Sequence, residues 1–180
     1  MTTMLLHDRP DFDPMDLRRS LGRFATGVTV ITTRGTDGTR IGMTANSFTS
    51  VSMDPPLLLF CVANNAPSLE HFKASGVFAI HVLSSEQRHL SSQFARPAAD
   101  KFAGLEVAVD EDGVPAIKGV LVRFACRTVS SYVEGDHTIF VGRVNAHTRG
   151  EGDPLVFFSG EYKITGDHPE IPPLRGSTES

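Results

Sequence analysis

Short β-branched and apolar runs, separated by clusters of turn-forming residues, recur along the chain and constrain its fold more than any other feature. The run VTVITT at 28–33 is closed by Gly, Thr and Asp at 35–38, a pattern that predicts a strand and a tight turn. Further strands are expected within 40–52 and at 57–63, 77–83, 105–109, 120–133, 137–146 and 155–158. About seven strands at short spacing predict a mainly β fold, a small antiparallel barrel whose closure removes exposed strand edges.

Three short helices interrupt this pattern. Residues 13–24 are predicted as a helix because Asp13 can cap it, Pro14 suits its first position, and Leu17, Leu21 and Phe24 share one face. A second helix is expected at 67–75, where Gly76 ends it. Ser84 and Gln87 have the spacing of a capping box for a third helix that carries Leu90 and Phe94.

Length and charge limit the function classes. A chain of 180 residues with 40% apolar residues is expected to form a single domain over 1–180, with an ordered core at about 13–165 and extended tails at 1–12 and 166–180. The second tail lacks an apolar period and is expected to lie extended or on a partner subunit. The formal net charge of −4, without a basic run, makes nucleic acid an unlikely partner.

Membrane insertion and export are not expected. The longest apolar run, at 57–63, is far shorter than the roughly 20 residues that span a bilayer, and the first residues lack the order of a signal peptide. Cys61 and Cys126 lie far apart in apolar runs, which indicates two buried thiols in a reducing compartment. We therefore expect a cytoplasmic protein.

The chain contains none of the common motifs of dinucleotide folds, P-loops, HExxH or CxxC metal sites, or GxSxG hydrolases. No two histidines have metal-ligand spacing, and His71, His81 and His89 are interpreted as packed or solvated residues. These absences favour chemistry in which a bound organic cofactor reacts and the protein positions it.

Three segments are candidates for binding such a cofactor. The stretch GMTANSFTS at 42–50 places small and hydroxylated residues where a buried strand normally carries Val or Ile, so its amides can approach a flat ring, although a polar edge strand has the same composition. The segment ANNAPS at 63–68 precedes a helix start, which can bind a phosphate or be an ordinary cap. The turn GDH at 135–137 sets His137 beside Asp136, which suits substrate binding and an ordinary hairpin alike.

These segments, in their order and spacing, resemble one known family. The matching pieces are TGVTVITT at 26–33, GMTANSFTSVS at 42–52 with DPPL at 54–57, FAIHVL at 78–83, FA at 94–95 with DKF at 100–102, GDH at 135–137, and PL at 154–155 leading to GEY at 160–162. From about Leu17 to Tyr162 the chain resembles the small flavin reductases of two-component flavin-dependent monooxygenases, which have an FMN-binding split-barrel fold.

The resemblance implies a homodimer in which each subunit binds FAD or FMN, accepts a hydride from NADH or NADPH, and supplies reduced flavin to a separate monooxygenase; we favour FAD and NADH. The residues implied to line the ring and ribityl chain are Met43, Thr44, Ala45, Asn46 and Ser47. Those implied around the phosphate are Cys61, Val62, Ala63, Asn64 and Ser68, with Gln93 and Phe94 closing the pocket. His137, as the catalytic residue that orients the nicotinamide, is implied to face it together with Phe158, Ser159, Gly160 and Tyr162. Lys101 and Arg40 match more loosely: Lys101 is assigned no role, and for Arg40 a phosphate contact and exposure to solvent both remain open.

Three alternatives remain open from the sequence. A non-catalytic flavin-binding or sensor protein has the same barrel. The presence of His137 and of an open region at Gly160 argues against this alternative, because such a protein needs neither. An oxidase that acts on a small phosphorylated substrate requires a basic cluster, which the sequence does not show. An oligonucleotide-binding barrel is disfavoured by the negative charge and by the presence of two Tyr and no Trp for stacking on bases.

Overall fold

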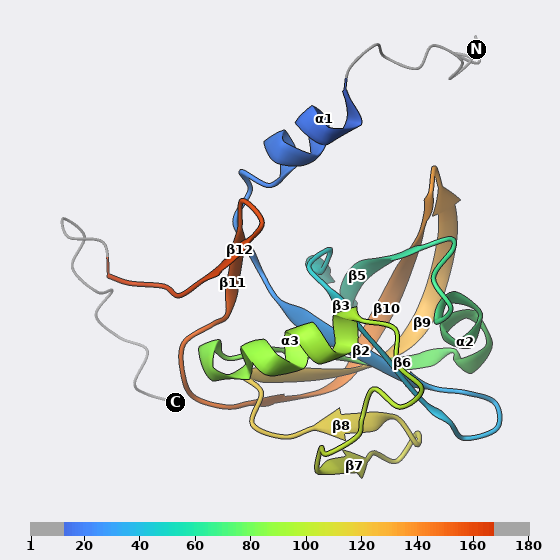
Figure 1. Cartoon of the computed structure of the whole chain (residues 1–180). Helices are drawn as coiled ribbons and strands as arrows, with labels where there is room; N and C mark the ends of the chain where they lie inside the picture. The colour runs from blue at the N-terminus through green and yellow to red at the C-terminus, as the bar shows by residue number, and fades with distance from the viewer. Residues whose placement is uncertain (1–12, 168–180) are drawn as a thin grey trace, which may run out of the picture.

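Seven antiparallel strands form the main sheet in the computed structural model, which describes residues 13–167 (Figure 1). In spatial order the strands are β3 (Arg40–Ala45), β2 (Thr29–Arg34), β6 (Val77–Val82), β9 (Val122–Glu134), β10 (His137–Arg149), β5 (Pro56–Ala63) and β4 (Thr49–Met53). The predicted mainly β, antiparallel fold is confirmed. Within the described residues no ladder joins β3 to β4, so closure of the barrel stays a prediction.

Two small sheets flank the main one. One contains β1 (Thr26–Gly27), β11 (Val156–Phe158) and β12 (Glu161–Lys163), and the other pairs β7 (Val107–Val109) with β8 (Pro115–Ile117). The sequence analysis does not predict β1, β8 or β12, and it treats 40–52 as one return segment where the structure has β3 and β4. Strands of two or three residues are too short to show a period, which explains why they were missed.

The predicted helices are present, with shorter bounds. They are α1 (Pro14–Leu21), α2 (Leu69–Ser75) and α3 (Arg88–Ala95), and α3 follows a 3-10 turn, η1 (Ser85–Gln87). The Asp13 side chain accepts from the Met15 amide at 2.9 Å, and both hydrogen bonds of the Ser84–Gln87 capping box are made. The expectation that the first helix reaches residue 24 is wrong. Tighter turns follow Leu21, and the carbonyl of Gly22 then accepts from the Ser159 amide.

Phenylalanine dominates the core between the main sheet and the helices. The ring centroid of Phe60 lies 4.8 Å from that of Phe78, 5.2 Å from Phe140 and 5.4 Å from Phe72 of α2, and all four rings are buried. Aromatic pairs at such separations contribute about 0.5–1.5 kcal/mol beyond their burial. This cluster attaches α2 to the sheet, and a second cluster that includes Leu90 and Phe94 attaches α3.

The burial of the two cysteines differs from the prediction. Cys126 is buried, but Cys61 is only half-buried, so the expectation of two buried thiols is wrong for Cys61. It lies on the face of β5 that points away from the phenylalanine cluster, because Phe60 and Val62 on either side of it point inward. No helix among residues 13–167 is long and apolar enough to cross a bilayer. The cytoplasmic location stays a prediction. The predicted tails at 1–12 and 166–180 lie outside the described residues, except for residues 166 and 167.

Candidate functional site

A pocket of about 440 Å³ opens between β3, the segment before α2, and the end of α3. Its volume lies in the range of small-molecule sites, about 300–1,000 Å³. The residues around it come from three segments that are distant in sequence: Arg40, Ile41, Gly42, Met43, Thr44, Ala66, Pro67, Ser68, His71, Phe94, Ala95, Pro97, Ala98, Ala99 and Lys101. Of the residues expected to bind flavin, the pocket brings together Met43, Thr44, Ser68 and Phe94.

Side chains of β3 form one wall of this pocket. The Thr44 hydroxyl donates to the carbonyl oxygen of Ser91 at 2.7 Å, which joins β3 to α3. The Ser68 hydroxyl lies 3.6 Å from the sulfur of Met43, which joins β3 to the start of α2. These contacts hold the wall in place without an ion pair.

Phe94 lines the pocket, whereas its neighbour Gln93 does not. The Phe94 ring is fully buried and lies over Gly42, where a Cβ atom would come within 2.5 Å of it. Gln93 points at the following loop instead, and its Nε2 donates to the carbonyls of Lys101 at 2.8 Å and Ala103 at 3.1 Å. Gln93 therefore fixes the loop that forms the pocket's outer wall.

Positive charge gathers at the end of the pocket near Arg40. The Lys101 ammonium donates to the carbonyl of Phe94 at 2.8 Å, and burial lowers the pKa of Lys101. Arg40 pairs with Asp100 at 3.3 Å and lies over the Phe102 ring. His71 completes this end. The sequence analysis assigned Lys101 and His71 no role and left a phosphate contact open for Arg40, although Lys101 stands in the DKF piece of the resemblance.

The segment after β3 lies against β5. The Ser47 hydroxyl accepts from the amide of Cys61 at 3.0 Å, while the carbonyl of Ala45 accepts from the Thr29 hydroxyl at 2.6 Å. Asn46 is exposed between them. Burial raises the pKa of the Cys61 thiol, so this thiol is predominantly protonated at neutral pH. The segment therefore presents small side chains and backbone groups rather than a charged or nucleophilic group.

Val62 and Asn64, both expected near the flavin phosphate, lie at the end of β5, beside the start of β10. Val62 is fully buried in the phenylalanine cluster, so only its backbone can contact a ligand. The Asn64 side chain donates to the carbonyl of Gly135 at 3.2 Å and accepts from the Thr138 hydroxyl at 2.8 Å. Because Ala63 also pairs with His137 across the strands, the structure brings the expected phosphate segment next to the histidine turn.

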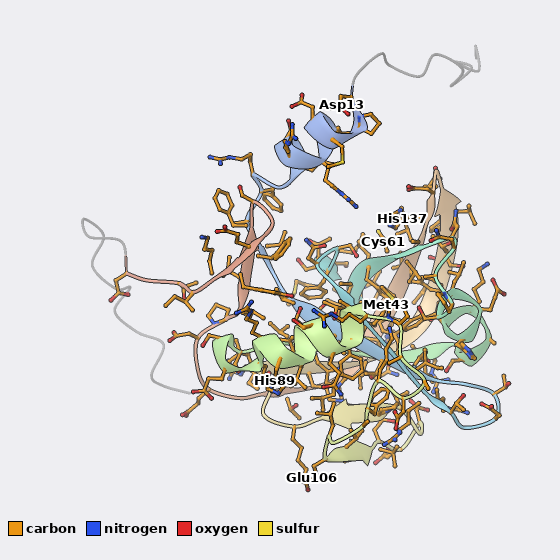
Figure 2. All side chains as sticks on the ribbon, in the orientation of Figure 1. Asp13, Met43, Cys61, His89, Glu106 and His137 are labelled. Carbon is orange, nitrogen blue, oxygen red and sulfur yellow. The ribbon has the colours of Figure 1, made fainter. Side chains whose placement is uncertain are left out.

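His137 is exposed at the start of β10, and its Nδ1 lies 2.6 Å from a carboxylate oxygen of Asp136. This hydrogen bond lowers the pKa of Asp136. An ionised Asp136 accepts from Nδ1–H and leaves Nε2 directed elsewhere. His137, Cys61 and Met43 follow one another along one side of the molecule (Figure 2).

The remaining expected residues lie on the β11–β12 hairpin. Ser159 and Gly160 form its turn with φ of 50° and 83°, and Arg23 lies over the ring of Phe158 with its guanidinium carbon 5.0 Å from the centroid. Tyr162 directs its hydroxyl at Ser91 of α3. The hairpin lies on the other side of the molecule from the end of the β9–β10 hairpin (Figure 1), so one chain does not bring these residues next to His137.

Comparisons with known proteins establish the family. The model of the "Flavin reductase like domain" matches residues 21–166, and the chain belongs to this family. It is 46% identical to an FMN reductase (NADH), SmoA, of Agrobacterium fabrum over 81% of this chain and 82% of the relative. It is 44% identical to the reductase component of a flavin-dependent trigonelline monooxygenase of Acinetobacter baylyi, over 82% of this chain and 47% of the relative.

Solved structures agree. An NADH:FAD oxidoreductase of Streptomyces globisporus, SgcE6, solved with NAD and FAD fragments, superposes with a TM-score of 0.82 and 38% identity, over 89% of this chain and 96% of the other. The names of these proteins confirm the expected class of enzyme, an NADH-dependent flavin reductase. The chain spans about half the length of some of the curated relatives that it matches.

Proposed function

We propose that this chain transfers a hydride from NADH to FAD or FMN and releases the reduced flavin to a separate monooxygenase. A bound flavin would supply the hydride acceptor, its N5, for the nicotinamide C4 of NADH, and solvent would supply the proton that completes the reduction. Orientation of two stacked rings lowers the barrier to this step without a protein acid or base. The observation that carries the proposal is the pocket beside β3, which combines four of the expected flavin-contacting residues with a positively charged end.

The lining of the pocket fits a flavin. Met43, which is half-buried in the wall of the pocket, offers apolar surface for a planar ring. The Thr44 hydroxyl and the groups that follow it supply hydrogen bonds to the ring edge or the ribityl chain. Lys101 and Arg40 provide the positive charge that suits a phosphate. We assign Ala45, Asn46, Ser47, Cys61, Val62, Ala63, Asn64, Ser68 and Gln93 to the surroundings of the flavin on the strength of the resemblance.

His137 is proposed to orient the nicotinamide. It is exposed, its ring is held by Asp136, and it has a free Nε2. Phe158, Ser159, Gly160 and Tyr162, which the resemblance places on the same side, lie on the distant β11–β12 hairpin. A second subunit is one way to bring such a hairpin to His137, and this supports the proposed homodimer.

The first helix supports a homodimer independently. None of its residues is buried, and it stands away from the rest of the described chain (Figure 1). Leu17 and Leu21 of the helix, and Phe24 shortly after its end, are 42%, 67% and 78% exposed. Isolated helices of eight residues are unstable in water, so an apolar face of this kind needs a cover. We propose that a second copy of the chain covers it and completes the split barrel dimer.

The proposed activity is tested by the loss of NADH absorbance when FAD, FMN or riboflavin is added in turn to the purified protein. We expect oxidation that depends on added flavin, with the reduced flavin detectable under anaerobic conditions. Flavin binding without NADH oxidation would identify the non-catalytic binding protein instead. Absence of both flavin binding and NADH oxidation would reject the proposal.

A further inference from the structure

Ser91, on the buried side of α3, connects two parts of the molecule that the sequence keeps far apart. Its carbonyl oxygen accepts from the Thr44 hydroxyl at 2.7 Å, and its own hydroxyl lies 2.8 Å from the phenolic oxygen of Tyr162. Ser91 is only 1% exposed. A continuous chain of contacts therefore runs from β12 through α3 to the pocket wall on β3.

The Tyr162 ring is fixed from two further sides. Its centroid lies 5.5 Å from that of Phe157 in an edge-to-face arrangement, and the guanidinium carbon of Arg88 lies 5.3 Å from it on a face. With its ring held in this way, the hydroxyl has a defined position, and Ser91 is its partner there. Tyr162 thus holds α3 one helical turn before Phe94, which lines the pocket.

The hydrogen bond between Thr44 and Ser91 determines which hydrogen bonds the Thr44 hydroxyl can make with a ligand. A threonine hydroxyl has one hydrogen and two lone pairs. Since the hydrogen of Thr44 is committed to Ser91, the hydroxyl can only accept a hydrogen bond from a ligand in the pocket. A flavin has matching donors in the N3–H of its ring and in the ribityl hydroxyls.

We propose that Tyr162 is a positioning residue for flavin binding, which acts through Ser91 to keep α3 and the acceptor oxygen of Thr44 in place. This inference rests on the proposed function, since it concerns the same pocket. It assigns Tyr162 to the flavin side of the reaction, whereas the resemblance placed it on the nicotinamide side.

The test is Tyr162→Phe, which removes one hydroxyl and keeps the ring between Phe157 and Arg88. Loss of one hydrogen bond predicts a rise of about two- to tenfold in the flavin Kd and in the flavin KM, with kcat and the NADH KM within about twofold of wild type. Ser91→Ala removes the other hydroxyl of the same pair. The double variant is expected to bind flavin no more weakly than either single variant, because both remove one contact.

Tyr132→Phe is the matched control, since Tyr132 is an exposed tyrosine of β9 and loses the same atom. Flavin Kd is measured by fluorescence quenching without NADH, so it reports on this inference even if the protein fails to oxidise NADH, a result that would count against the proposed activity alone. An unchanged flavin Kd in Tyr162→Phe, or a rise in the NADH KM alone, would overturn the positioning role. Thermal unfolding of each variant identifies a general loss of structure.

Discussion

His137 is attached to the fold by its strand pairing with Ala63 and by the hydrogen bond from its ring to Asp136. Because the hydride step needs no protein acid or base, we propose that the exposed ring of His137 contacts the nicotinamide. We predict that His137→Ala raises the NADH KM by about two- to tenfold and lowers kcat by a smaller factor, as measured by steady-state kinetics at saturating flavin.

The control for this prediction is His89→Ala. His89 is exposed on α3, does not line the pocket, and is expected to give wild-type kinetics. A large fall in kcat with an unchanged NADH KM in His137→Ala would contradict the orienting role, because it would show that the imidazole contributes to the transition state alone.

His81 is the opposite case, a fully buried histidine. Its Nδ1 lies 3.1 Å from the Val30 carbonyl, and its Nε2 accepts from the Ile117 amide at 3.2 Å, so the neutral Nδ1–H form satisfies both partners. Burial lowers the pKa of His81 to about 4. Because the unfolded chain binds a proton near pH 6.5, the fold loses stability as pH falls from about 6.5 to 4, by about 3 kcal/mol in total.

We therefore predict that the free energy of unfolding in urea is lower at pH 5 than at pH 7.5. His81→Gln is expected to be less stable than wild type at pH 7.5, but to show a smaller further loss at pH 5, since it cannot bind the proton. An equal loss between the two pH values in both proteins would assign the pH dependence to other groups.

At the scale of elements, β3 and α3 meet where a glycine faces a ring. A Cβ atom at position 42 would come within 2.5 Å of the Phe94 ring and 3.2 Å of the Phe102 ring. Both rings are buried and cannot give way without disturbing α3. We predict that Gly42→Ala lowers the free energy of unfolding by about 1–3 kcal/mol and raises the flavin Kd, because Phe94 lines the pocket.

Gly27→Ala is the matched control. Gly27 also lies in a strand, and an added Cβ there meets nothing within 4 Å. Its stability and flavin binding are expected to remain close to wild type. If both alanine variants were equally stable, the small residue at position 42 would have to be explained by the ligand rather than by packing.

The length and period of an element determine whether the sequence alone can predict it. Residues 28–33 and 77–83 were predicted within one residue of β2 and β6, because their β-branched runs are bounded by turn residues. The Ser84–Gln87 box is local and was also confirmed. The end of α1 was missed because its last contact, from Gly22 to Ser159, spans most of the chain.

At the scale of the whole molecule, the sequence located the pieces of the site but not how they meet. Arg40, His71 and Lys101 come together only after β3, α2 and the loop after α3 have packed, so no local pattern marks them. The family match over 21–166 confirms the class that the ordered motifs indicated. The distance between His137 and the β11–β12 hairpin is likewise a property of the folded chain.

The distance between His137 and the β11–β12 hairpin, together with the exposed face of α1, leads to one further prediction. If a second copy covers Leu21 and Phe24, the protein in solution has twice the 19.5 kDa mass of one chain. Replacing both residues with serine removes apolar area whose burial would contribute about 25 cal/mol per Å² to association. We expect this change to shift the mass, measured by light scattering after size exclusion, toward that of one chain. NADH oxidation is expected to fall with it, because the proposed contact between the β11–β12 hairpin of one copy and the histidine turn of the other would be lost.

Val109→Ser is the control for this experiment, since Val109 is a 66% exposed apolar residue on β7 and not on α1. This variant is expected to keep the mass and the activity of the wild type. A wild-type protein with the mass of a single chain and full NADH oxidation would reject the dimer. The exposed face of α1 would then need another cover, and His137 would have to bind the nicotinamide without the β11–β12 hairpin.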